Sequence, residues 1–87
     1  MKTVKELLSK LEIAEIETDK AENTYELDPM NKEAENAFDE AYTKEFNLYV
    51  ATAKEIVKIT SNNIDFMTAK AIVKDKRNDL KNLLANN

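Results

Sequence analysis

Carboxylate side chains are concentrated between residues 12 and 40 of this chain. That segment holds eleven acidic and two basic residues, a net charge of −9, whereas the remaining residues have a net charge of +5. The whole-chain charge of −4 therefore belongs to a molecule with one acidic third and a mildly basic remainder. Such asymmetry favours recognition of a basic partner through long-range attraction.

Acid–base catalysis is one chemistry that carboxylates perform. Pairs such as Glu15 with Asp19, and Glu35 with Asp39, are expected on an exposed helix, where no pocket separates their pKa values. The chain has no histidine and no cysteine, which removes the commonest general base, the thiol nucleophile and the usual zinc ligands. It also has no glycine, which phosphate-binding loops require. We therefore expect no enzymatic activity and no cofactor.

Calcium binding is a second chemistry of clustered carboxylates. A calcium loop needs oxygen ligands at alternating positions and a central glycine. In a loop that starts at Asp28, the third and fifth positions are Met30 and Lys32, which supply no such ligand. The sequence therefore predicts no metal site.

Two interpretations of the acidic segment remain. The carboxylates can form a solvated helical surface that keeps a small protein soluble. Alternatively, they can form a docking surface for a basic groove, in the extreme case by imitating nucleic-acid phosphates. The residues that would form this acidic surface are Asp19, Glu22, Glu26, Asp28, Glu33, Glu35, Asp39 and Glu40.

Three helices are expected to position these residues. Over about residues 3–27, an apolar or small residue recurs at alternating steps of three and four, as in helices that pack lengthwise. Pro29 disfavours helix at the preceding residue and fits the first turn of a second helix, over about 30–60. The polar triplet 61–63 ends this helix, and a third covers about 65–85. The seam of the first helix comprises Val4, Leu7, Leu11, Ala14, Thr18, Ala21 and Tyr25.

The second helix has two adjoining apolar stripes, which predicts a position between two neighbours. One stripe comprises Ala34, Ala37, Ala41, Leu48, Thr52, Ile56 and Ile59, and the other comprises Phe38, Tyr42, Phe46, Tyr49, Ala53 and Val57. Because the connections are short, both neighbours should be antiparallel to it. We expect an all-α fold: one domain over residues 1–87, built as an up-down-up antiparallel three-helix bundle.

The third helix is about ten residues shorter than the second. The hairpin of the first two helices should therefore extend past it by roughly 15 Å, with the acidic segment at the free end. Lys76 interrupts the apolar face of the third helix, and we expect it to lay its methylenes on the core. The aromatic stripe should be mostly core. Phe38 and Tyr42 at its start could lie past the third helix and remain partly exposed, with Phe38 as an anchor.

A second candidate contact surface lies on the first helix. Ile13 and Ile16 point far from the seam, and Leu27 shares their side. They are either scattered exposed apolar residues, residues that the third helix covers, or an apolar spot for a partner or a second copy. Nucleic-acid binding is disfavoured, because the bases of the third helix alternate with Asp75 and Asp79. No segment is long and apolar enough for a membrane span or a signal peptide.

The chain is short, acidic, free of glycine, helical in pattern and rich in lysine, asparagine and isoleucine. In these general features it resembles small accessory proteins of low-GC bacteria and their phages. Some of those proteins, including anti-CRISPR proteins, block basic nucleic-acid grooves. We expect a cytoplasmic, non-enzymatic inhibitor or adaptor that docks its acidic hairpin on a basic, nucleic-acid-binding protein. The alternatives are an assembly protein that forms a homodimer or larger oligomer through Ile13, Ile16 and Leu27, or a helical protein like bacteriocin-immunity proteins.

Overall fold

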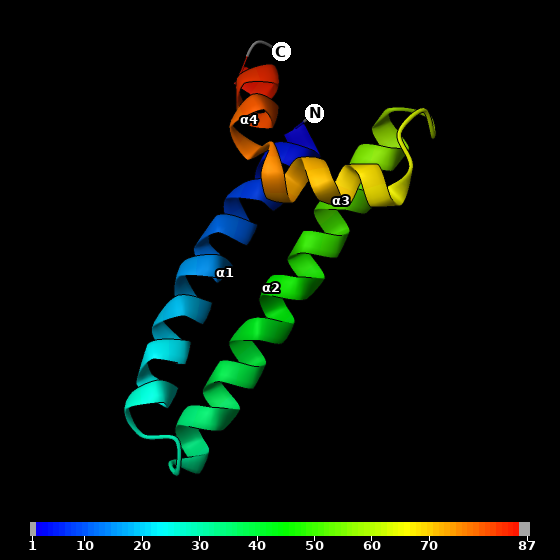
Figure 1. Cartoon of the computed structure of the whole chain (residues 1–87). Coiled ribbons are helices and arrows are strands. Elements are labelled where there is room, and N and C mark those ends of the chain that lie inside the picture. Colours follow the sequence, from blue (N-terminus) through cyan, green and yellow to red (C-terminus); the bar gives the residue numbers. More distant parts are fainter. Residues whose placement is uncertain (1, 86–87) are drawn as a thin grey trace.

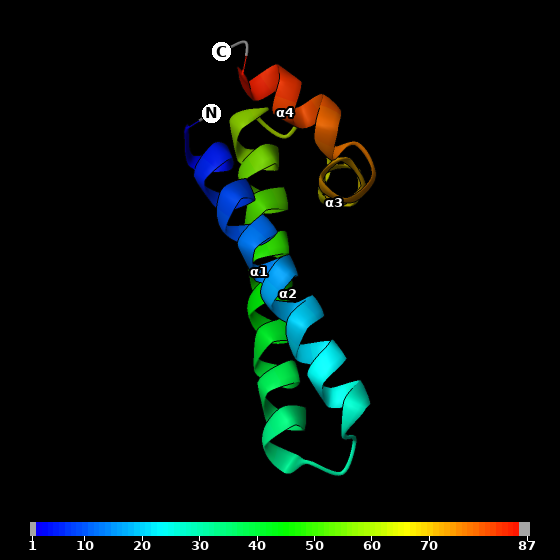
Figure 2. The ribbon, with the colours of Figure 1, turned by 90° about the vertical axis from the view of Figure 1, so that its left-hand side faces the viewer.

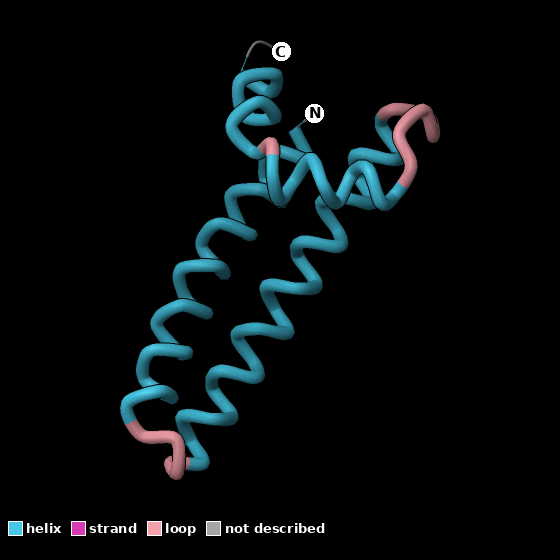
Figure 3. Tube along the Cα trace, viewed as in Figure 1, coloured by secondary structure: helices cyan, strands magenta, loops and turns pink. Residues whose placement is uncertain are grey.

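The computed structural model describes residues 2–85, and within them the side chains of residues 3–82. The described chain is folded into four helices, α1 (Lys2–Leu27), α2 (Lys32–Ile59), α3 (Phe66–Asp75) and α4 (Arg77–Ala85). The long helices α1 and α2 form an antiparallel hairpin, and α3 crosses it near the end of α2 (Figures 1 and 2). Residues 2–85 contain no strand (Figure 3), which confirms the predicted all-α class.

The turn between α1 and α2 forms where the sequence predicts it. Asn31 is the N-cap of α2, and its side-chain oxygen accepts hydrogen bonds from the backbone N–H groups of Glu33 (3.0 Å) and Ala34 (3.3 Å). Glu33 and Glu35 lie in the first turn of α2, where their negative charges interact favourably with the positive end of the helix dipole. Pro29 lies in the turn before this cap. Its ring and its missing N–H prevent α1 from continuing.

Packing between α1 and α2 follows the predicted seam of α1. Every fourth or third residue from Val4 to Thr18 is buried, apart from the half-buried Leu7. The Thr18 hydroxyl lies 2.8 Å from the carbonyl oxygen of Ala14 and 3.1 Å from that of Ala41 on α2. The stripe predicted for α2 is wrong at Ala37 and Ile59, both of which are exposed. A helix with only one lengthwise neighbour buries a narrower stripe than one between two neighbours.

The third predicted helix is divided at Lys76. This residue has φ −124° and ψ 35°, and it ends α3 by donating its N–H to the Ile72 carbonyl at 3.0 Å. Its own carbonyl accepts from Leu80 at 3.0 Å, so α4 begins at once in a new direction. The predicted up-down-up three-helix bundle is not confirmed, because α3 crosses the hairpin (Figure 1). Leu83 and Leu84, which the sequence predicts on the apolar face of the third helix, lie outside the described side chains.

The turn after α2 sets the crossing. Ser61 and Asn62 have left-handed backbone angles, with φ of 53° and 65°, which turn the chain sharply away from α2. Ala53 of α2 and Ala69 of α3 are both fully buried, and such small side chains allow two helices to cross closely. The main hydrophobic core lies here and comprises Val4, Leu8, Leu11, Ala53, Ile56, Ala69, Val73 and Leu80. As predicted, the hairpin extends well beyond α3 (Figure 2).

Candidate interaction surfaces of the hairpin

The free end of the hairpin exposes two large apolar side chains. Leu27 closes α1 and is 88% exposed, and Met30 follows in the turn and is 93% exposed. Asp28 lies between them in sequence and is also exposed. Leu27 was predicted as a contact residue, whereas Met30 was not. Its position between Pro29 and the Asn31 cap could have identified it, because a turn residue between two helices has no neighbour to cover it.

The predicted acidic residues lie on the part of the hairpin that α3 leaves uncovered. Six of the eight are exposed, and Glu22 and Glu35 are half-buried. Within residues 3–82, only Glu35 among them forms an ion pair, with Lys32 at 3.5 Å. The negative charge of the other seven is therefore not balanced by a paired base of this part of the chain.

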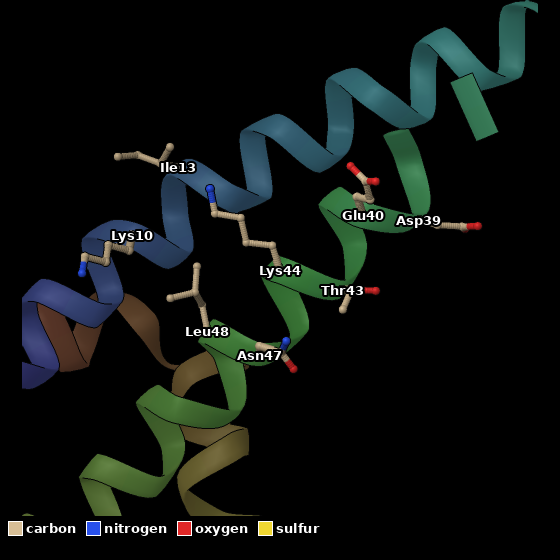
Figure 4. Close-up of a pocket in the computed structure, with 8 residues that line it drawn as sticks. All are labelled: Lys10, Ile13, Asp39, Glu40, Thr43, Lys44, Asn47 and Leu48. Atoms are coloured by element: carbon tan, nitrogen blue, oxygen red, sulfur yellow. The ribbon is translucent and has the colours of Figure 1, made fainter. Parts of the chain in front are cut away.

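The acidic residues do not form a single surface. Asp39 and Glu40 line a groove of about 920 Å³ between α1 and α2, together with Lys10, Ile13 and Lys44 (Figure 4). In Figure 4, Lys44 extends from α2 toward α1, whereas Asp39 points away from α1. The Lys44 ammonium lies 3.7 Å from the Glu17 carboxylate of α1. Charges of both signs thus border this shallow groove.

The three acidic residues Asp19, Glu22 and Glu26 of α1 continue a row that begins at Glu12 and Glu15. Steps of three and four residues place all five on one face of α1. Glu12 is 2.7 Å from the Lys81 ammonium, and Glu15 pairs with the Arg77 guanidinium. The row therefore faces the side of the hairpin on which α3 and α4 lie. We call these five residues the acidic row.

Beside the acidic row lies an exposed aromatic strip on α2. Tyr42 is 55% exposed and Phe46 is 48% exposed, and both border a cavity of about 370 Å³ below α3. The predicted anchor Phe38 is only half-buried by its neighbours, with its ring stacked on Tyr25 at 5.8 Å and edge-on to Tyr42 at 6.5 Å. We call Phe38, Tyr42 and Phe46 the aromatic strip.

Glu45 lies between the acidic row and the aromatic strip. Burial, together with the charges of Glu15 and Asp19, raises the pKa of this carboxyl above its ordinary value. The same cavity is lined by Lys70, Lys74 and Arg77 at the α3 end. This corner thus combines crowded carboxylates, partly exposed aromatic rings and a basic edge.

The predicted apolar residues Ile13 and Ile16 are not covered by α3. Each side chain is 57% exposed.

Among the residues that the structure describes, no three acidic, histidine or cysteine side chains are grouped to hold a metal ion. Within the same part of the chain, none of the helices has the length and apolar character needed to cross a membrane.

Comparisons with known proteins place this chain in no family. No protein-family model matches it, and no curated protein or solved structure is significantly similar to it.

Proposed function

We propose that this chain is a non-enzymatic binding protein that docks its acidic hairpin on a basic protein surface and blocks it. The observation that supports this most is the set of seven carboxylates, on the uncovered part of the hairpin, without an ion pair within residues 3–82. A groove that binds nucleic acid is the expected target, and a small phage-type inhibitor acting in the bacterial cytoplasm is the expected biological form.

Occlusion requires only that the hairpin reach the basic surface and stay there. Long-range attraction between opposite charges accelerates the encounter, and salt weakens it. At the free end, Leu27 and Met30 provide an apolar centre with acidic residues around it. An apolar centre inside a polar rim is the usual arrangement of a protein interface. The bound hairpin would then exclude the nucleic acid sterically and by charge.

A charge-reversal pair of variants tests this proposal. The first variant replaces Glu22, Glu26, Glu33 and Asp39 by lysine and thus reverses the charge of the uncovered hairpin. Proteins captured from the native host by the wild-type chain are identified by mass spectrometry. Their affinities for both chains are then measured over a range of salt concentrations. We expect basic nucleic-acid-binding proteins that the variant binds at least about tenfold more weakly.

A matched control variant has the same total change in charge, but its substitutions lie outside the acidic segment of the hairpin. It replaces the four acidic residues Glu6, Glu55, Asp75 and Asp79 by lysine, and circular dichroism verifies the helix content of both variants. We expect the control to bind the captured protein nearly as well as the wild type. Equal loss in both variants, or unchanged affinity and salt dependence in the first, would show that the hairpin acids are not the docking surface.

A further inference from the structure

The aromatic strip is an apolar face of α2 that no other helix within residues 2–85 covers fully, although Phe38 at one end stacks on Tyr25 of α1. A lengthwise third helix would cover it, yet α3 crosses the hairpin and leaves the free end of α2 uncovered (Figures 1 and 2). The Tyr49 hydroxyl donates a hydrogen bond to the Lys70 carbonyl oxygen at 2.9 Å, so α3 contacts α2 at Tyr49. Beyond it, about half of the surfaces of Tyr42 and Phe46 remain accessible.

The acidic row borders this strip and already binds basic side chains at one end. Arg77 pairs with Glu15 and Lys81 pairs with Glu12, so the α4 end of the chain occupies the first two positions. Asp19, Glu22 and Glu26 form no ion pair within residues 3–82. Three carboxylates of the same row therefore remain unpaired in this part of the chain, and they continue from the level of Tyr42 toward the free end of the hairpin.

The chemistry of this face specifies its occupant. From Asp19 to Glu26 the unpaired part of the row extends over roughly 10 Å, about two helical turns. A straight helix laid on the strip would meet apolar rings at its centre and carboxylates along one edge. It would therefore need apolar residues on one side, flanked by lysine or arginine at steps of three and four.

The two ends of the face also favour one direction for that helix. Lys70 and Lys74 line the cavity at the α3 end, where they would attract the partial negative charge of a helix C-terminus. At the free end, Glu26 and Asp28 would attract a positively charged N-terminus. We propose that the aromatic strip and the acidic row together bind one basic amphipathic helix of a partner protein, with its C-terminus toward α3. This inference rests on the proposed function and specifies which element of the basic partner is bound.

A synthetic peptide tests this inference directly. The probe is a basic amphipathic helix of about 18 residues, or five turns, with leucine on one face and lysine on its flanks. A scrambled peptide of the same composition has the same charge but no apolar face. Fluorescence anisotropy should show the wild-type chain binding the amphipathic peptide at least about tenfold more tightly than the scrambled one.

Variants on two faces locate the binding. The double variant Tyr42→Ala/Phe46→Ala should weaken binding of the amphipathic peptide by at least about tenfold. The double variant Ile13→Ala/Ile16→Ala removes equally exposed apolar side chains from outside the strip and should leave the affinity unchanged. Equal binding of both peptides, or no effect of the Tyr42 and Phe46 changes, would overturn the inference.

The outcomes separate this inference from the proposed function. If charge reversal of the hairpin still abolishes binding to a captured basic protein while the strip variants do not, the docking function stands and the helix-binding face is wrong. A second copy of the chain is the competing occupant. Sedimentation that shows a dimer of the wild type, and a monomer of Tyr42→Ala/Phe46→Ala, would also overturn the inference.

Discussion

At the scale of single residues, Tyr49 joins α3 to the hairpin. Its hydroxyl donates to the Lys70 carbonyl, and the Lys70 ammonium lies 5.9 Å from the ring centre of Tyr49. Replacing Tyr49 by phenylalanine keeps the ring and removes the hydrogen bond. We expect the free energy of unfolding to fall by about 1 kcal/mol, as measured by urea denaturation.

Tyr42→Phe provides the control for this prediction. The ring of Tyr42 is more than half exposed, and its hydroxyl forms no hydrogen bond within residues 3–82. Its removal should therefore change stability by a few tenths of a kcal/mol at most. Equal effects of the two substitutions would mean that the Tyr49 hydroxyl does not hold α3.

At the scale of elements, the turn after α2 holds an ordinary residue in a conformation that favours glycine. Ser61 has φ of 53°, which costs a non-glycine residue about 1 kcal/mol or more. Glycine avoids this cost but loses more backbone entropy on folding. We expect Ser61→Gly to raise the free energy of unfolding by about 0.5 kcal/mol, measured by thermal or urea unfolding. Asn63→Gly, where φ is not left-handed, should lower it, and the reverse order would refute this reasoning.

Helix positions were predictable from local signals, whereas the path of the third element was not. Pro29 and the Asn31 cap fix the first turn, so the bounds of α1 and α2 agree with the predicted ranges within two residues. The spacing of apolar residues continues across Lys76, so it indicated one helix where there are two. A lysine inside an apolar stripe was the only local sign of the break. The direction of α3 depends on the left-handed turn after α2 and on the close crossing at Ala53 and Ala69.

At the scale of the whole molecule, burial is concentrated at one end of the hairpin. The main core lies where α3 crosses, whereas the free end buries little more than Ala34. Segments with few buried apolar contacts open at lower free energy than the core. In native-state hydrogen exchange, we expect α1 and α2 amides near the free end to exchange by opening events below the global unfolding energy. Amides around Ile56 and Val73 should require nearly global unfolding, and uniform protection along α2 would contradict this.

The same scale explains how much of the candidate surface was predictable. The sequence places the carboxylates on a projecting hairpin, and the structure agrees. It left open whether the third helix covers Ile13 and Ile16, and the structure shows that both are exposed, as is Leu27. The structure also divides the acidic residues between two sides of the hairpin. Helical geometry predicts which of them share a side, but it does not predict which side faces α3. Partial exposure was expected for Tyr42, which is 55% exposed, but not for Phe46, which is 48% exposed. The exposure of Phe46 depends on α3 crossing the hairpin instead of lying along it.

The elongated shape has a consequence for rotation in solution. The molecule measures 46 × 22 × 19 Å, and its radius of gyration of 15.0 Å exceeds the roughly 12 Å of a compact domain of this length. Such a body spins faster about its long axis than it tumbles end over end. The helices α1 and α2 lie along that axis, whereas α3 lies across it (Figure 1). Backbone N–H bonds point along the axis of their helix. Nitrogen-15 spin relaxation should therefore distinguish the crossing helix from the hairpin, with higher R2/R1 ratios in α1 and α2.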